Sequence, residues 1–306
     1  MTLRFQRASF LALLGGLGWW GACAPLAAKS VRDQLPEDAG FARAAGQNVQ
    51  PFFEGWQRLP DGQIVMWFGY LNRNYQEELD IPVGAGNKFD LRDDLGQPTH
   101  FYTRRRLFVF KVAIPADWPA DKRLTWTLTV NGRTSAANGW KQPEWEVDEG
   151  VIQMNIGPGG APPINPPNTA PRISVNGDTT IEAGKQLKLT ASATDDGIPA
   201  PRNLNRNAVA NNPSASRQPL PPGAAPPPRA QIGLRIRWIL YRAPAGGGRV
   251  AFEPDTTNIV AGGTSVQLTT QAIFSAPGAY WLRAIASDGM LETPYDLKVT
   301  VIDRQR

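Results

Sequence analysis

One histidine and one cysteine limit the chemistry that this chain of 306 residues can perform. They are His100, in the segment GQPTHF, and Cys23. A serine hydrolase needs a histidine beside an activated serine, and the sequence has no GxSxG motif to supply one. It also has no HExxH motif, and one histidine offers too few nitrogen ligands for a typical zinc centre. We therefore predict that His100 is a structural residue that makes a hydrogen bond, and we predict no catalytic residue.

Carboxylates occur in two local groups, and paired carboxylates can hydrolyse glycosides. The groups lie in EELDIP and PEWEVDE, and their members are Glu77, Glu78, Asp80, Glu144, Glu146 and Asp148. A glycosidase needs its two carboxylates on opposite sides of a cleft. Within each group the residues are near neighbours in sequence, so an acidic edge in solvent explains them more simply. A secreted carboxylate-dependent enzyme, such as a glycoside-active protein, is the alternative hypothesis.

The first half of the chain is unusually rich in aromatic residues, and exposed rings stack on sugars. Most of these rings are expected in a core, but some stand in turn-like segments, and GYLNRN adds polar residues directly after an aromatic strand. The predicted ligand-binding residues are Tyr70, Asn72, Arg73, Asn74, Trp118 and Trp140. We expect a carbohydrate or another cell-envelope component as their partner.

Positive charge is concentrated in TRRRL (103–107). On a strand, Arg104 and Arg106 share one face and Arg105 takes the other. A solvated strand edge that charge protects from pairing is favoured, and an anionic ligand site is the alternative. The formal net charge of +5 is too small to indicate a nucleic-acid partner.

Strand signals fill both halves of the chain, and no segment of any length has helical periodicity. In RLTWTLTV, for example, Leu124, Trp126 and Leu128 alternate with polar residues. We predict an all-β fold with two β-sandwich domains in tandem, at 49–156 and 172–302, in which EWEV (144–147) is also a strand. A Pro/Gly linker at 157–171 joins the domains. Residues 198–230 have almost no large apolar side chain, so we predict a disordered insertion there.

The first 28 residues have the pattern of a secretory signal peptide. Arg4 and Arg7 precede an apolar run at 10–20, and small residues lead to a cleavage site after Ala28. Residues 29–48 follow as a flexible lead-in. This pattern predicts an exported protein, periplasmic or extracellular, that is not integral to the membrane. The alternative is a lipid anchor on Cys23, because WGAC partly resembles a lipobox.

Four segments of the second half occur in a specific order: NTAPRISV, KQLKLTASATDDGIP, LRIRWILYRAPAGGGRVAF and FSAPGAYWLRAIASDG. In this order they resemble immunoglobulin-like domains of the polycystic-kidney-disease (PKD) type, over about residues 168–302. The resemblance implies that Trp238 packs between two sheets and that Tyr280 forms a tyrosine corner. It places Trp281, Arg283 and Ile285 on the outward face of the same strand as Tyr280.

The first half is similar to an uncharacterised domain of secreted bacterial proteins. The similarity rests on FEGW, GYLNRN, ELDIPVG and GQPTHF, and it implies no activity. The function that the whole sequence predicts is an exported, non-catalytic binding or structural module of the bacterial cell envelope or extracellular space.

Calcium is the one cofactor that the sequence suggests. Asp195 and Asp196 lie in ATDDG, and Asp288 lies in SDG. In an immunoglobulin-like sandwich these two loops lie at the same end, so their hard oxygen ligands converge and suit Ca²⁺. Some PKD-type domains look similar and bind calcium there. The alternative is that Asp-Gly is ordinary turn chemistry.

Overall fold

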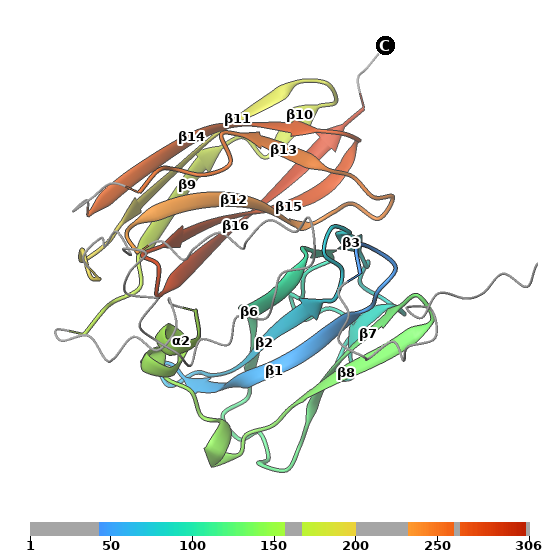
Figure 1. Cartoon of the computed structure of the whole chain (residues 1–306), viewed down its shortest axis with the longest axis vertical. Coiled ribbons are helices and arrows are strands. Elements are labelled where there is room, and N and C mark those ends of the chain that lie inside the picture. The colour runs from blue at the N-terminus through green and yellow to red at the C-terminus, as the bar shows by residue number, and fades with distance from the viewer. Residues whose placement is uncertain (1–42, 157–166, 200–231, 260–263, 304–306) are drawn as a thin grey trace, which may run out of the picture. The chain divides into compact units, whose positions relative to one another are not determined.

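Alternation of apolar and polar residues along short strands builds two separate hydrophobic cores. The structure is a computed structural model that describes residues 43–156, 167–199, 232–259 and 264–303 (Figure 1). We call residues 43–156 the first region and residues 167–303 the second region; both belong to one compact unit, Ala42–Arg306. The signal peptide, almost all of the predicted insertion and most of the linker lie outside the described residues.

Small antiparallel sheets build the first region, with the strand orders β1-β2-β6, β4-β7-β8 and β3-β5. The strands are β1 (Val49–Arg58), β2 (Ile64–Asn72), β3 (Leu79–Asp80), β4 (Asn87–Phe89), β5 (His100–Phe101), β6 (Arg104–Ile114), β7 (Leu124–Val130) and β8 (Arg133–Gly139). In β7 the alternation follows the sequence prediction, since Leu124, Trp126, Leu128 and Val130 are buried in the core.

Aromatic rings fill the centre of the first core. Trp126 packs edge-on against Phe68 and Phe110, with ring centres 6.1 and 5.0 Å away, and it stacks on Phe89 at 6.1 Å. Its indole nitrogen donates a hydrogen bond to the buried Asn87 Oδ1 at 2.9 Å. The rings therefore supply both the volume of the core and a fixed orientation within it.

Two bulges break the pleat of the first sheet, and a glycine lies at each. In β1, Glu54 is an extra residue between Phe53 and Gly55. In β6, the extra residues lie between Arg106 and Phe110, opposite Gly69 of β2. A Cβ atom on Gly69 would collide with the Glu54 carboxylate and with a main-chain carbonyl of β6. Only glycine leaves room here for the buried Glu54 to pair with the Arg105 guanidinium at 2.6 Å.

The segment EWEV, which we predicted as a strand, is helical in part. Its first two residues belong to the short 3₁₀ helix η1 (Pro143–Trp145), and α2 (Glu149–Ile156) follows it. Pro143 supplies the fixed φ that suits a helix start, and the Asp148 carboxylate accepts a hydrogen bond from Val151 N at 2.8 Å. These local capping signals outweigh the short alternation that suggested a strand. Among the described residues, no helix has the length and apolar character to span a membrane.

Two four-stranded sheets build the second region, with the orders β10-β16-β15-β12 and β13-β14-β11-β9. In Figure 1 they form the two layers of a sandwich. The strands are β9 (Arg172–Gly177), β10 (Thr180–Glu182), β11 (Gln186–Thr194), β12 (Arg235–Arg242), β13 (Val250–Glu253), β14 (Ser265–Phe274), β15 (Gly278–Ser287) and β16 (Glu292–Ile302). Read as strands A to G, with β10 as an extra strand after A, these orders give the ABED and CFG sheets of an immunoglobulin-like sandwich. The predicted all-β sandwich class is confirmed.

Two aromatic residues of the second core occupy the places that the sequence predicted. Trp238 on β12 is buried and stacks on Phe252, with ring centres 5.8 Å apart. Tyr280 on β15 is buried as well, and its hydroxyl donates a hydrogen bond to Ala276 O at 2.7 Å. This bond to the backbone four residues upstream is the tyrosine corner of immunoglobulin-like sandwiches.

The predicted outward face of β15 is not in solvent. Arg283 and Ile285 are both buried, and Trp281 is half-buried. The Arg283 guanidinium forms a two-point ion pair with Asp296 and donates a third hydrogen bond to Val109 O of β6 at 2.7 Å. The predicted register of β15 is confirmed, because Tyr280, Leu282, Ala284 and Ala286 face the second core. The first region covers the outward face, where Arg283 bonds to Val109 O.

Polar contacts join the two regions at a second place. The Arg242 guanidinium of β12 donates two hydrogen bonds to Asp94, at 2.9 and 2.8 Å, and a third to Gln97 O at 2.8 Å. These bonds hold the pKa of Asp94 at about 2. Nearby, Leu240 N donates to the Tyr102 hydroxyl at 2.9 Å. Loops of the first region thus bind directly to the exposed edge of β12.

Candidate functional site

Two of the three aromatic residues that we predicted for sugar stacking, Tyr70 and Trp118, are core residues. Tyr70 and Trp118 expose only 2% and 4% of their surface. The Tyr70 hydroxyl accepts a hydrogen bond from Tyr102 N at 3.0 Å, and the Trp118 indole donates to Lys122 O at 3.0 Å. Their polar tips are therefore satisfied inside the protein, and neither ring is available to a ligand.

The polar residues after Tyr70 are structural too. Asn72 and Asn74 are fully buried, and their side-chain amides bond to backbone carbonyls of neighbouring segments. Asn74 Oδ1 also accepts a hydrogen bond from Gln47 N at 2.7 Å. Arg73 is half-buried. These asparagines connect the end of β2 to neighbouring segments by hydrogen bonds, so the predicted polar ligand surface at 72–74 does not form.

Trp140 is half-buried, and the Arg123 guanidinium covers its ring at 3.5 Å. Among the described residues, Trp145 is the exposed tryptophan, with 43% of its surface in solvent. It lies in η1, and its ring packs against Phe53 with centres 5.6 Å apart. We did not select Trp145 from the sequence, although the proline before it at 143 is a turn signal that could have indicated an exposed position.

The three aspartates predicted for calcium come close enough to interact, together with the chain that follows the linker. Asp288 is buried; its carboxylate accepts hydrogen bonds from Met290 N and Leu291 N, and from the Asn168 side-chain amide at 2.9 Å. Burial, its largest influence, raises the pKa of Asp288. Asn168 is itself buried, and its Oδ1 atom has no hydrogen-bond partner in the described chain.

Asp195 and Asp196 differ in their contacts. Both Asp196 oxygens accept hydrogen bonds, from Ile198 N and from the backbone and hydroxyl of Thr169. Asp195 Oδ1 is buried and has no partner among the described residues. Burial, with repulsion from Asp288 and Asp196, raises the pKa of Asp195 to about 6. No cluster of three or more His, Cys, Asp or Glu side chains within the described chain is arranged to hold a metal ion.

His100 lies in a chain of charges that links the two regions. Its Nδ1 atom is 2.7 Å from Asp80 Oδ1, and its Nε2 atom is 3.1 Å from Glu78 Oε2. Asp80 also pairs with Arg249 of the second region. Burial opposes the charged imidazole, but the two carboxylates outweigh it and raise the pKa of His100. The histidine makes structural bonds, as we predicted, and both of its nitrogens are engaged.

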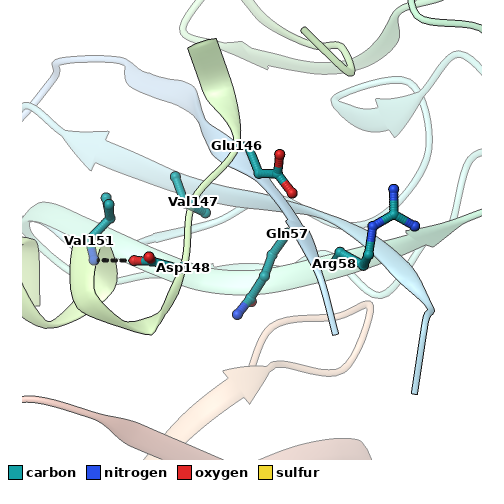
Figure 2. Close-up of a pocket in the computed structure, with 6 residues that line it drawn as sticks. All are labelled: Gln57, Arg58, Glu146, Val147, Asp148 and Val151. Carbon is teal, nitrogen blue, oxygen red and sulfur yellow. Dashed lines mark hydrogen bonds between the residues drawn. The ribbon is translucent and has the colours of Figure 1, made fainter. Parts of the chain in front are cut away.

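A shallow cavity of about 270 Å³ lies where β1 ends and the chain enters α2 (Figure 2). Its lining residues are Gln57, Arg58, Glu146, Val147, Asp148 and Val151. Figure 2 shows the Asp148 carboxylate bonded to the helix start at Val151, while Glu146 points away from it. Hydrolysis of a glycoside requires two carboxylates that face each other across a cleft. Glu146 and Asp148 do not face each other across this cavity.

Comparisons with known proteins add little. No protein-family model and no curated protein matches the sequence. A protein of unknown function from Porphyromonas gingivalis W83 aligns over 83% of this chain and 99% of its own, with 13% identity and a TM-score of 0.22. The titin domains Z1Z2 in complex with telethonin align over 85% of this chain and 100% of theirs, with 11% identity and a TM-score of 0.20. At these TM-scores the likenesses carry no argument about function.

Proposed function

We propose that this chain is an exported, non-catalytic binding or structural module of the bacterial cell envelope or extracellular space. One observation carries the non-catalytic part: the side chains best suited to catalysis are engaged in structural bonds. Both nitrogens of His100 contact carboxylates, and Asp148 caps a helix. The immunoglobulin-like sandwich is a scaffold on which binding surfaces commonly occur, which supports the proposal by analogy only.

Carbohydrate or an envelope polymer is the proposed partner, and Trp145 is the stacking residue that the exposed surface offers. The mature chain should be retained on insoluble cell-wall or glycan fractions, and W145A should lower its affinity about tenfold. L91A is a matched control, because Leu91 is exposed to 50% but has no aromatic ring. Equal retention of both variants would rule out stacking at Trp145. Release of reducing ends from any glycan would overturn the non-catalytic proposal.

Export is tested by determining the N-terminal residue of the protein in each cell fraction of a bacterium that produces it. The proposal expects an N-terminus at Lys29 in the secreted or periplasmic fraction, because the cleavage pattern ends at Ala28. A diacylglycerol on Cys23 would instead show the lipid-anchored alternative. An N-terminus at Met1 in the cytoplasm would contradict export.

Calcium remains part of the proposal, with a changed set of ligands. The donors that fit best are Asp195 and Asn168, whose Oδ1 atoms are buried and have no partner within the described chain. The Asp288 and Asp196 carboxylates already accept hydrogen bonds on both oxygens, so their main contribution would be negative charge. A bound Ca²⁺ would supply charge neutralisation, which removes the repulsion among these carboxylates.

The calcium site is tested by thermal melting of the mature chain with Ca²⁺, with Mg²⁺ and with a chelator. Ca²⁺ at 100 times its Kd should stabilise the native state by about 2.7 kcal/mol. D195N should lose this response, whereas E182Q should keep it, because Glu182 precedes β11 and Asp195 follows it, at opposite ends of that strand. The same melting temperature in Ca²⁺ and chelator would contradict the site.

A further inference from the structure

Arg106 of the first region and Arg237 of the second act on the Tyr102 side chain, and Arg235 lies beside Arg237 on β12. The Arg106 guanidinium of β6 lies 5.8 Å from the centre of the Tyr102 ring. The Tyr102 hydroxyl accepts a hydrogen bond from Leu240 N, which brings it to the edge of β12. On β12, Arg235 and Arg237 alternate with buried residues and therefore share the face opposite the second core. The charges of Arg106 and Arg237 both act on the Tyr102 hydroxyl, and the charge of Arg237 acts on Arg235.

The donors of this arginine cluster (Arg106, Arg235 and Arg237) are incompletely used. The Nε atom of each of the three residues is buried and has no hydrogen-bond partner within the described chain. Buried donors are nearly always paired in proteins. A buried donor without an acceptor costs its desolvation free energy, which is larger than the net stabilisation that one hydrogen bond gives. Three unpaired guanidinium donors in one place therefore indicate a missing acceptor rather than three unrelated defects.

Nearby carboxylates do not supply that acceptor. Glu292 approaches Arg237 with both oxygens at 3.4 Å, which is long for a charge-assisted hydrogen bond. Glu78 influences Tyr102 electrostatically but contacts His100 with its carboxylate. In the described chain, neither Arg106 nor Arg235 forms an ion pair with a carboxylate. Burial and the charge of Arg237 lower the pKa of Arg235, which remains a cation at neutral pH.

We propose that Arg106, Arg235 and Arg237 form a binding site for an oxyanion, a phosphate or a carboxylate group. Guanidinium groups are the usual partners of such groups, because their planar donors match two oxygens at once. The anion can be free in solution or part of an acidic envelope polymer, and the chemistry of recognition is the same. The site combines residues of both regions, so its occupant would also join them.

Isothermal titration of inorganic phosphate into the mature chain tests the site directly, at pH 7 and constant ionic strength. The proposal expects saturable binding that chloride does not reproduce, and it expects R106Q and R235Q each to weaken it about tenfold. R123Q is the matched control, because Arg123 also covers an aromatic ring but directly precedes β7, which belongs to another sheet than β6 and β12. Neither R106Q nor R235Q removes an ion pair of the described chain, and a cooperative melt of each variant confirms folding.

Binding that chloride reproduces, or an equal loss in R123Q, would overturn the site.

A second experiment separates the possible sources of the anion. Co-sedimentation with polygalacturonate and with a poly(glycerol phosphate), against neutral dextran, should show retention on an acidic polymer that R106Q abolishes if the polymer is the source. Phosphate binding without polymer retention shows a site for a free anion. Polymer retention that R106Q and R235Q leave unchanged would overturn the site, even if the module binds envelope material by another surface.

Discussion

The two cores reach the same degree of burial with different side chains. In the described chain, eight of the 18 buried residues of the first core are Trp, Phe or Tyr, against three of the 17 in the second. The second core instead uses five alanines, among them Ala284 and Ala286 on β15, which let its two sheets approach around one tryptophan. The first core is thus filled by large rings and the second by close contact of small residues.

The rings of the two cores also differ in how their polar atoms are satisfied. In the first region the indoles of Trp56, Trp118 and Trp126 all donate hydrogen bonds. In the second region the indole nitrogen of Trp238 is buried without a partner in the described chain. Hydrogen bonds therefore fix the indoles of the first core, whereas packing alone orients Trp238 in the second, where the hydrogen-bonded ring is Tyr280.

Truncation of the central tryptophans should have the largest effect and should separate the two cores. W126A removes a ring with four aromatic neighbours and leaves Asn87 Oδ1 without its donor. It should cost about 5 kcal/mol of the free energy of unfolding, the upper end for a buried tryptophan, and W238A about 3 kcal/mol. Chemical denaturation followed by circular dichroism measures both.

Phenylalanine at the same two positions is the sharper comparison. W126F keeps an apolar ring but leaves the buried Asn87 oxygen unpaired, so it should cost at least about 1 kcal/mol beyond the loss of volume. W238F removes a donor that has no partner, so only the volume term remains. Equal costs at the two positions would show that the indole hydrogen bond does not distinguish the cores.

Separation of the regions from each other should have the next largest effect. Arg242 makes three hydrogen bonds to the first region, and Trp281 lies under its guanidinium at 4.2 Å. R242Q should lower the free energy of unfolding by about 2 kcal/mol, because Arg242 is largely buried although Asp94 is half exposed. Calorimetry should show one transition in the wild type and a broader or divided one in R242Q. A sharp single transition in both would show that other contacts couple the cores.

Much of the second region follows from its sequence, because its strands have period-two patterns, and the bulge in β12 between Leu240 and Arg242 comes after Trp238. The resemblance to immunoglobulin-like domains placed Trp238 and Tyr280. The burial of Arg283 could not be predicted, since it depends on Val109, which lies 174 residues earlier. Local sequence patterns cannot predict that a strand is covered by a segment so distant in the sequence.

The first region was harder to predict for a local reason. The bulge before Gly55 changes the phase of the alternation in β1, and the bulge opposite Gly69 changes it in β6, so the core faces of these two strands are hard to read from the sequence. Tyr70 instead continues the regular alternation of Met66 and Phe68 in β2 and is buried, although we expected it at the surface. Among the calcium candidates, the loop positions of Asp195 and Asp288 followed from the sandwich topology. Asn168 begins the motif NTAPRISV, but its contact with Asp288 joins residues 120 positions apart, which no local pattern indicates.

Tyrosine hydroxyls allow the same comparison at a smaller scale. Y280F removes the bond to Ala276 O, whereas Y70F leaves the Tyr102 amide without its acceptor. An unsatisfied buried amide costs more than a lost bond to a carbonyl near solvent. We expect about 1 kcal/mol for Y280F and about 2 kcal/mol for Y70F by equilibrium unfolding in urea. The reverse order would contradict the view that hydrogen bonds matter more in the first core.

The smallest effect concerns pH and the contact between His100 and its two carboxylates. Burial alone would lower the pKa of His100, but hydrogen bonds and charges of Asp80 and Glu78 raise it above the ordinary value of about 6.5. A folded-state pKa above the unfolded one means that the charged histidine stabilises the native state fully below pH 6.5. This stabilisation is lost as the pH rises through the folded-state value.

NMR titration of the single imidazole should therefore give a pKa above 6.5. Melting temperatures measured from pH 6 upward should fall over that interval more steeply in the wild type than in H100Q. Because Asp80 also pairs with Arg249, the loss should appear first where the two regions meet, as faster exchange of the Tyr102 amide than of the Trp126 amide. A pKa at or below 6.5 would show that burial outweighs the two carboxylates, and the contact would then owe nothing to protonation of the histidine.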